Sequence, residues 1–227
     1  MLGAGMVGRT IALDLAQSHS VTSFDISQDN LALLRSLNPE IKTAKRDLLN
    51  FAAYPSFLKS FQLVINAVPG FMGFSSLAAI IQAKKNCVDI SFFPDNPLTL
   101  HELAVKKGVS VITDCGVAPG ISNLILGRMD QEYKIDAFTC YVGGIPQNPQ
   151  PPFYYKAPFS PVDVVQEYLR PCIVREKGKV LTKEPLTERE LITFSALPEP
   201  LEAFITDGLR TLIHTMKHIP ELKEKTL

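Results

Sequence analysis

The 227-residue sequence carries no net charge, because 23 acidic residues balance 23 basic ones and the two signs are well mixed. A surface without excess positive charge argues against a nucleic-acid or anionic-membrane partner. The sequence has no apolar run near the roughly 18 residues that a membrane span needs. It also shows no secretory leader and no internal repeat. We therefore expect a cytoplasmic protein without a membrane segment.

Cysteine is scarce, and its spacing excludes two further classes of protein. The sequence has four cysteines and no CxxC motif, so neither a disulfide framework nor a zinc site is expected. We expect no metal and a reducing compartment. The hydrophobic fraction of 46% is ordinary for a globular chain of this length, which can bury a proper core.

A glycine motif, GAGMVG at residues 3–8, opens the sequence and runs directly into an apolar helical stretch. In a dinucleotide-binding fold such glycines make the turn out of the first strand, admit the pyrophosphate and let the helix pack on the sheet. Only Met1 and Leu2 precede the motif, where a strand of about five residues is normal. This suggests a clipped first strand or a piece of a longer chain. The cofactor-binding residues predicted here are Gly3, Gly5, Met6, Val7 and Gly8.

An acidic residue, Asp25, follows the next predicted strand and lies 17 residues after Gly8. At this spacing a carboxylate accepts hydrogen bonds from both hydroxyls of the adenosine ribose and repels a 2′-phosphate. Asp25 therefore favours NAD over NADP as the cofactor. The alternative is an ordinary acid that caps the following helix.

Apolar strand segments alternate with helical segments over the first half of the chain. This βαβ pattern with short connections predicts an α/β fold, a Rossmann-type doubly wound parallel sheet. Helices are predicted over residues 31–37 and 75–84, and from Pro97 to Gly108. The predicted strands are residues 21–25, 41–46, 63–68, 87–91 and 109–113.

Polar residues at strand ends are further candidates, because ligands bind at the carboxyl edge of such sheets. Asp47 either lies near the adenine or is a solvated turn acid. Residues 66–69 are expected to line the nicotinamide side of the site. They are Asn66, Ala67, Val68 and Pro69.

The second half reads as an α+β domain, and the Gly/Pro-rich segment before it is typical of the passage from a cofactor domain to a substrate domain. The predicted boundary separates a dinucleotide-binding domain, 1–118, from a substrate domain, 119–227. A proline-rich segment with Phe153 and other aromatics is either a pocket wall or a linker. We expect a helix capped by Ser160, a hairpin at Lys177-Gly178, a strand over 201–205, and a turn at 206–208 that leads into a helix from Leu209 to Met216.

Several segments together resemble the saccharopine dehydrogenase-like family, most closely its L-lysine 6-dehydrogenases. They are GAGMVG (3–8), NAVPG (66–70), VDISF (88–92), TDCGVAPGISN (113–123), YVGGIP (141–146), YYKAPFSP (154–161), TDGLRTL (206–212) and KEKTL (223–227). The resemblance implies an NAD(P)-dependent enzyme that oxidises a carbon–nitrogen bond of an amino acid. It also implies that the second, mixed-sheet domain binds the substrate and dimerises, usually giving a homodimer. Relatives extend beyond this chain at both ends. The alternatives are a saccharopine or carboxynorspermidine dehydrogenase, or a truncated, non-catalytic NAD-binding remnant.

For lysine oxidation at the ε-amine, the protein must accept a proton and anchor the distant carboxylate. Asp114 either receives the amine proton or is a turn carboxylate. His214 is a second candidate base or a structural residue. Lys156 and Arg210 are candidate partners of the substrate carboxylate. The remaining substrate-binding candidates are Cys115, Gly116 and Tyr155.

Overall fold

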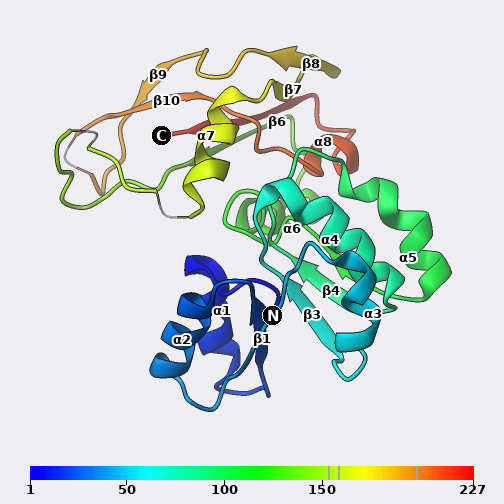
Figure 1. Cartoon of the computed structure of the whole chain (residues 1–227). Helices are drawn as coiled ribbons and strands as arrows, with labels where there is room; N and C mark the ends of the chain where they lie inside the picture. Colours follow the sequence, from blue (N-terminus) through cyan, green and yellow to red (C-terminus); the bar gives the residue numbers. More distant parts are fainter. Residues whose placement is uncertain (153, 158, 198) are drawn as a thin grey trace. The chain divides into compact units, whose positions relative to one another are not determined.

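The chain divides into two compact units, Met1–Cys115 and Gly116–Leu227, each of which is described by itself. The computed structural model describes residues 1–152, 154–157, 159–197 and 199–227. In Figure 1 the colours run from blue to green along the first unit and from green to red along the second. Phe153 and Pro158, which belong to the predicted aromatic segment, lie outside the described residues.

The first unit contains a parallel sheet built around its first residues. Leu2 forms parallel bridges to Phe24 on one side and Asn66 on the other, so the chain start joins a two-stranded and a three-stranded segment. Its amide donates to the Ile65 carbonyl at 2.9 Å, and its carbonyl accepts from the Ala67 amide at 2.8 Å. The short segment 1–3 thus occupies a central strand position. The strands are β1 (Thr22–Asp25), β2 (Lys42–Lys45), β3 (Leu63–Asn66), β4 (Asn86–Asp89) and β5 (Val111–Ile112).

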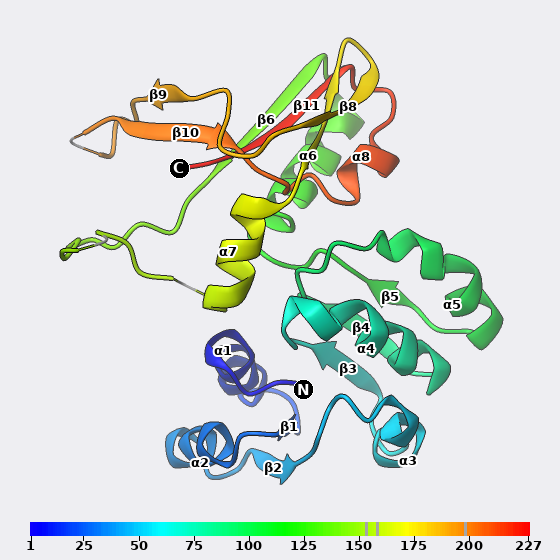
Figure 2. The same ribbon diagram turned by 45° about the horizontal axis from the view of Figure 1, so that its top comes forward.

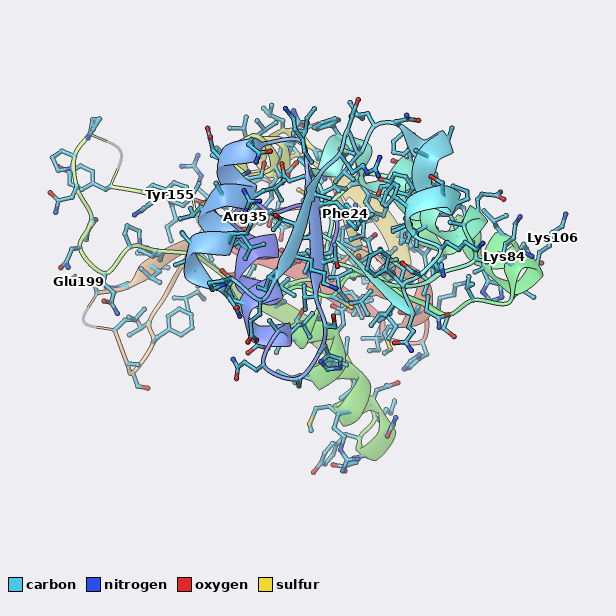
Figure 3. The ribbon with its side chains drawn as sticks, turned by 60° about the horizontal axis from the view of Figure 1, so that its bottom comes forward. Phe24, Arg35, Lys84, Lys106, Tyr155 and Glu199 are labelled. Atoms are coloured by element: carbon cyan, nitrogen blue, oxygen red, sulfur yellow. The ribbon has the colours of Figure 1, made fainter. Side chains whose placement is uncertain are left out.

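Helices build a separate apolar core on each face of this sheet, which makes the fold doubly wound. The first core joins α1 and α2, and the second joins the segments from α3 to α5 (Figure 2). In the second core the Phe24 ring of β1, labelled in Figure 3, lies 4.9 Å from the Phe57 ring. The helices are α1 (Met6–Leu15), α2 (Gln28–Leu37), α3 (Tyr54–Phe57), α4 (Gly70–Gln82) and α5 (His101–Lys107), with the 3-10 turns η1 (Phe51–Ala53) and η2 (Pro97–Leu100).

The second unit is a mixed sheet with helices packed on it. Its strands follow the order β8-β7-β11-β10-β9, and β6 pairs in parallel with β11. The helices are α6 (Ile121–Glu132), α7 (Pro161–Leu169) and α8 (Leu212–Thr215). The strands are β6 (Ala137–Val142), β7 (Cys172–Glu176), β8 (Lys179–Lys183), β9 (Glu190–Ile192), β10 (Leu201–Ile205) and β11 (Glu221–Thr226).

The predicted local signals of the second unit are confirmed at two places. The Ser160 hydroxyl accepts the Asp163 amide at the start of α7, with Pro161 as its first residue. Lys177 and Gly178 both have positive φ and connect β7 to β8, as a tight hairpin turn requires. Both elements are set by short-range chemistry, so the sequence predicts them well.

Two helix predictions need correction. The helix expected over 75–84 is Gly70–Gln82 and begins directly after its N-cap residue Pro69; Gly70 and Gly73, which have low helix propensity, hide this start in the sequence. The helix expected from Leu209 begins only at Leu212, since Arg210 has a φ of +49° that no α-helix allows. Strands β9 and β11 were not predicted at all.

Candidate dinucleotide site and the buried carboxyl groups

The glycine motif forms a tight loop between the chain start and α1. Gly3 has a φ of +92°, and a Cβ added there would lie 2.3 Å from the Ala67 carbonyl oxygen. A Cβ at Gly8 would lie 2.4 Å from the Gly3 carbonyl oxygen, so both positions require glycine. A Cβ at Gly5, by contrast, would meet no atom within 4 Å. The loop is therefore held tightly on its inner side and is open at Gly5.

The open side of this loop lies at the N-terminus of α1, where Gly5 is the N-cap residue and no side chain caps the helix. The first-turn amides of Met6, Val7 and Gly8 have no partner within the helix, as at any helix start. Together with the helix dipole, such amides bind phosphate oxygens. These residues therefore fit the pyrophosphate of a dinucleotide, as their spacing predicts.

Asp25 ends β1 beside this loop. Its Oδ2 accepts the Ala4 amide at 2.6 Å, and its Oδ1 accepts the Ser27 amide at 2.7 Å. The Ala4 bond ties the carboxylate to the glycine loop itself. The alternative interpretation was an acid that caps α2, but the N-cap residue of this helix is Ser27, and at the helix start Asp25 accepts only the Ser27 amide. Each oxygen keeps a second lone pair for a ligand hydroxyl.

The other strand-end candidates of this unit lie in different surroundings. Asp47 is exposed, and its Oδ1 accepts the Leu49 amide at 2.9 Å, as in a turn. Ala67 and Val68 lie against the loop, since the Ala67 carbonyl approaches Gly3. Asn66 is fully buried with its side chain directed into the unit, and its carbonyl accepts the Ile90 amide at 3.0 Å, so neither group faces a cofactor as predicted.

A buried polar network, absent from the sequence-based prediction, explains the position of Asn66. The Ser76 hydroxyl of α4 donates to the Asn66 Oδ1 at 2.8 Å, and the Asn66 Nδ2 donates to the Asp89 Oδ1 at 3.2 Å. The Tyr54 hydroxyl lies 3.1 Å from that of Ser76. This network links α3, α4, β3 and β4. In the sequence Asp89 lies inside the predicted strand 87–91 and in the VDISF segment of the family resemblance, but neither signal gives it a role, and in the structure it ends β4.

Burial raises the pKa of Asp89 to about 7, and the nearby Asp114 carboxylate contributes in the same direction. Asp114 itself is partly buried and has a φ of +56°, just before the end of the unit. Burial, Asp89 and Asp114 raise the pKa of the Cys115 thiol, which makes it a poor nucleophile. The Cys115 Sγ lies 3.6 Å from the Thr113 carbonyl oxygen.

Gly116 and Gly120 fix the turn that begins the second unit. The Gly116 amide donates to the Pro119 carbonyl at 2.9 Å, and a Cβ on Gly120 would lie 1.8 Å from the Gly116 carbonyl oxygen. Gly120 has a φ of +144°. Gly116 and Gly120 are therefore needed for the backbone geometry of this turn.

In the second unit, Arg210 is the candidate closest to a buried acidic group. Its Nη1 lies 3.8 Å from Asp207 Oδ2, and both side chains are largely buried. Asp207 in turn neighbours Glu224, which is 3% exposed. Burial first, and then the Glu167 and Asp207 carboxylates, raise the pKa of Glu224 well above its ordinary value.

The remaining candidates of the second unit lie at its surface. Lys156 and His214 are exposed, and Tyr155, labelled in Figure 3, lies on the loop between β6 and α7. The structure therefore does not bring these three side chains together with Arg210 into a buried cluster. Among the residues that the structure describes, no group of three His, Cys, Asp or Glu side chains could hold a metal ion. None of the described helices has the length and apolarity to cross a membrane.

Together, the parallel sheet and the glycine loop define a Rossmann-type dinucleotide-binding unit followed by a mixed-sheet unit. Residues 1–112 match the family model of the saccharopine dehydrogenase NADP binding domain, and residues 116–227 match that of the saccharopine dehydrogenase C-terminal domain. The chain belongs to the saccharopine dehydrogenase family. Its resemblance to this family, inferred from the sequence motifs, is confirmed.

Known proteins with similar sequences or structures carry related names. The saccharopine dehydrogenase [NADP(+), L-glutamate-forming] of Saccharomyces cerevisiae is 25% identical over 97% of this chain and 52% of its own length. The α-aminoadipic semialdehyde synthase of Arabidopsis thaliana is 22% identical over 63% of this chain and 14% of its own length. The apo structure of the yeast saccharopine dehydrogenase superimposes with a TM-score of 0.77 at 23% identity, covering 99% of this chain and 53% of that one. The chain thus spans about half the length of this yeast relative, and less of the plant one.

Proposed function

We propose that this chain is the cofactor-binding and substrate-binding part of an NAD-dependent oxidoreductase that oxidises a carbon–nitrogen bond of an amino acid, with L-lysine as substrate at its ε-amine. The observation that carries the cofactor assignment is the Asp25 carboxylate, tied to the glycine loop through the Ala4 amide. A carboxylate fixed there favours ribose hydroxyls and repels a 2′-phosphate. The preference for NAD follows from this group.

NADP is the competing cofactor, because the matched family model and the yeast relative carry NADP in their names. A 2′-phosphate would need cationic partners near Asp25. Lys45 and Arg46 follow at the end of the neighbouring β2, and the Arg46 guanidinium lies 5.6 Å from the centre of the Phe57 ring. We propose that the nearer Asp25 carboxylate outweighs these two exposed cations.

In the proposed reaction, a nicotinamide cofactor, when bound, would supply the acceptor for the hydride that leaves the carbon bearing the amine. The first-turn amides of α1 would hold the pyrophosphate, and Asp25 the ribose. Asp114 would accept the proton of the substrate ammonium, which frees the nitrogen lone pair. Arg210 would pair with the substrate carboxylate, with Lys156 as the more exposed alternative. The exposed His214 is retained only as a second candidate base.

Saccharopine is the second candidate substrate, because the named relatives include saccharopine dehydrogenases. Carboxynorspermidine and a non-catalytic NAD-binding remnant are further alternatives. We also propose a homodimer in the cytoplasm, as the family resemblance implies.

Turnover assays on the purified chain separate these functions. NADH formation is followed with NAD and, in turn, lysine, saccharopine and carboxynorspermidine, at matched concentrations. We expect NADH with lysine and a loss of at least about 100-fold in rate for Asp114→Asn, in the range of a lost general base. If NADH forms only with saccharopine, then saccharopine and not lysine is the substrate. NAD binding without turnover on any of the three would support the remnant.

A further inference from the structure

Asp89 is a buried acid at the carboxyl edge of the first sheet, and the proposed mechanism assigns it no role. It is the last residue of β4 and pairs in register with Asn66, the last residue of β3. Only 1% of its surface is exposed. An acid at such a position costs stability when it is charged, unless something else compensates the charge.

The two oxygens of the Asp89 carboxyl group differ in their hydrogen-bond partners. Oδ1 accepts the Ser91 amide at 2.9 Å and the Asn66 Nδ2 at 3.2 Å. The orientation of the Asn66 amide is fixed in turn by the Ser76 hydroxyl at 2.8 Å. Oδ2 is buried and has no hydrogen-bond partner among the residues that the structure describes. The group is therefore anchored through one oxygen, while the other is left for a proton or a ligand.

The ionisable groups around Asp89 are few. Asp114 and the Cys115 thiol approach it from the segment after β5, and the Cys87 thiol lies on β4 itself. The Met1 amino group lies next to Cys87. Helix α4, which packs on β4, contains no ionisable residue. Burial raises the pKa of Asp89 to about 7, so a modest change of charge nearby alters its protonation at neutral pH.

A bound dinucleotide would bring such a charge to this edge. The glycine loop contacts the end of β3 through Gly3 and Ala67, and β4 lies one strand further, about 4.8 Å away. With the pyrophosphate at the loop, the nicotinamide half extends along the carboxyl ends of these strands. The oxidised nicotinamide ring carries a positive charge, and the reduced ring is neutral.

We propose that Asp89 distinguishes the oxidised from the reduced cofactor, releasing its proton to solvent when the cationic ring binds and keeping it when the neutral ring binds. The inference rests on the proposed nicotinamide cofactor. In the oxidised complex the O–H bond of the Asp89 carboxyl breaks, and the resulting carboxylate offsets the ring charge. In the reduced complex there is no charge to offset, so the buried acid stays neutral.

The test compares the dissociation constants of NAD and NADH by calorimetry between pH 6 and pH 8. We expect the preference for NAD relative to NADH to rise with pH, by up to about tenfold if the bound cation lowers the Asp89 pKa by one unit. Asp89→Asn should make the ratio independent of pH. Glu102→Gln, which removes an exposed acid of α5 in the same unit, should leave the pH dependence unchanged.

A second measurement on the unmodified protein covers the case in which Asp89→Asn fails to fold. The chemical shift of the Asp89 carboxyl carbon, followed by NMR in protein labelled at aspartate, should titrate with a midpoint near neutral pH. Adding NAD should move this midpoint to lower pH, and adding NADH should not. Two results would overturn the inference about Asp89 and leave the proposed function intact. They are a ratio of the NAD and NADH dissociation constants that does not change with pH, and a titration midpoint of Asp89 that NAD does not shift. Failure of both nucleotides to bind would instead contradict the proposed function.

Discussion

At the residue scale, Asp25 and Asp89 show how the surroundings of a strand-end carboxyl group decide its chemistry. Each oxygen of Asp25 accepts one backbone amide, and the side chain is partly exposed beside the glycine loop. Asp89 is buried, with both donors on one oxygen. The first arrangement leaves a lone pair on each oxygen that can accept a ribose hydroxyl. The second suits a group that gains and loses a proton.

Removing the charge of Asp25 should change which cofactor binds. Asp25→Asn keeps the size of the side chain but removes the repulsion of a 2′-phosphate. We expect the affinity for NAD to fall and the preference for NAD over NADP to shrink about tenfold or more, as for the loss of one nearby charge at the protein surface. Calorimetric titration measures both. The matched control is Asp29→Asn, which removes an exposed acid of α2. If Asp25→Asn leaves the preference for NAD over NADP unchanged, Asp25 does not select the cofactor.

Asp89 should also make stability depend on pH. Its pKa is about 7 in the folded chain and about 4 when unfolded, so between these values the folded state binds the extra proton. Stability should therefore fall as pH rises from about 4 to about 7, by at most about 1.4 kcal/mol per pH unit from this group, and level off above. Urea unfolding at several pH values should show that the unfolding free energy falls less steeply with pH in Asp89→Asn than in the unmodified chain. Equal slopes in the two proteins would show that Asp89 is ionised throughout.

At the element scale, β11 is the strand that the sequence does not reveal. Its residues ELKEKT contain one apolar side chain, yet it pairs with β6, β7 and β10. Glu221, Lys223 and Lys225 share one face of the strand, and Glu224 lies on the other. Lys223 pairs with Glu176 and Glu188, while the buried Glu224 lies beneath Gly208. Hydrophobic periodicity fails here because partners distant in sequence compensate the buried charges.

Gly208 provides the room for Glu224. A Cβ at this position would overlap the Glu224 carboxyl group, so Gly208→Ala must displace this buried side chain or the backbone that carries it. We expect a loss of about 2 kcal/mol or more in the unfolding free energy, as for other overpacked buried sites. Gly127→Ala is the control, because a Cβ inside α6 would meet only the Met216 methyl at 3.9 Å. It should be neutral or stabilising by up to about 1 kcal/mol. Equal unfolding midpoints for the two variants would contradict this packing.

At the scale of the whole molecule, the sequence predicts the first unit better than the second. Parallel strands that are buried on both faces appear in the sequence as apolar runs, so five strands of the first unit were predicted. The residues of the glycine loop and of the helix caps lie close together in the sequence, so they were predicted as well. The second unit depends on pairings such as β6 with β11, which no local pattern encodes. For the candidate site, the phosphate loop was predictable from spacing. The Asn66–Asp89 network was not, because it forms only when two strand ends meet.

Direct titration of the unmodified chain with NAD and with NADP tests the central claim, that the first unit is an NAD site organised by the glycine loop and Asp25. Calorimetry at pH 7 and a fixed salt concentration gives both dissociation constants. We predict saturable binding of one NAD per chain, at least about tenfold tighter than NADP. Tighter binding of NADP, or no binding of either nucleotide, would contradict it.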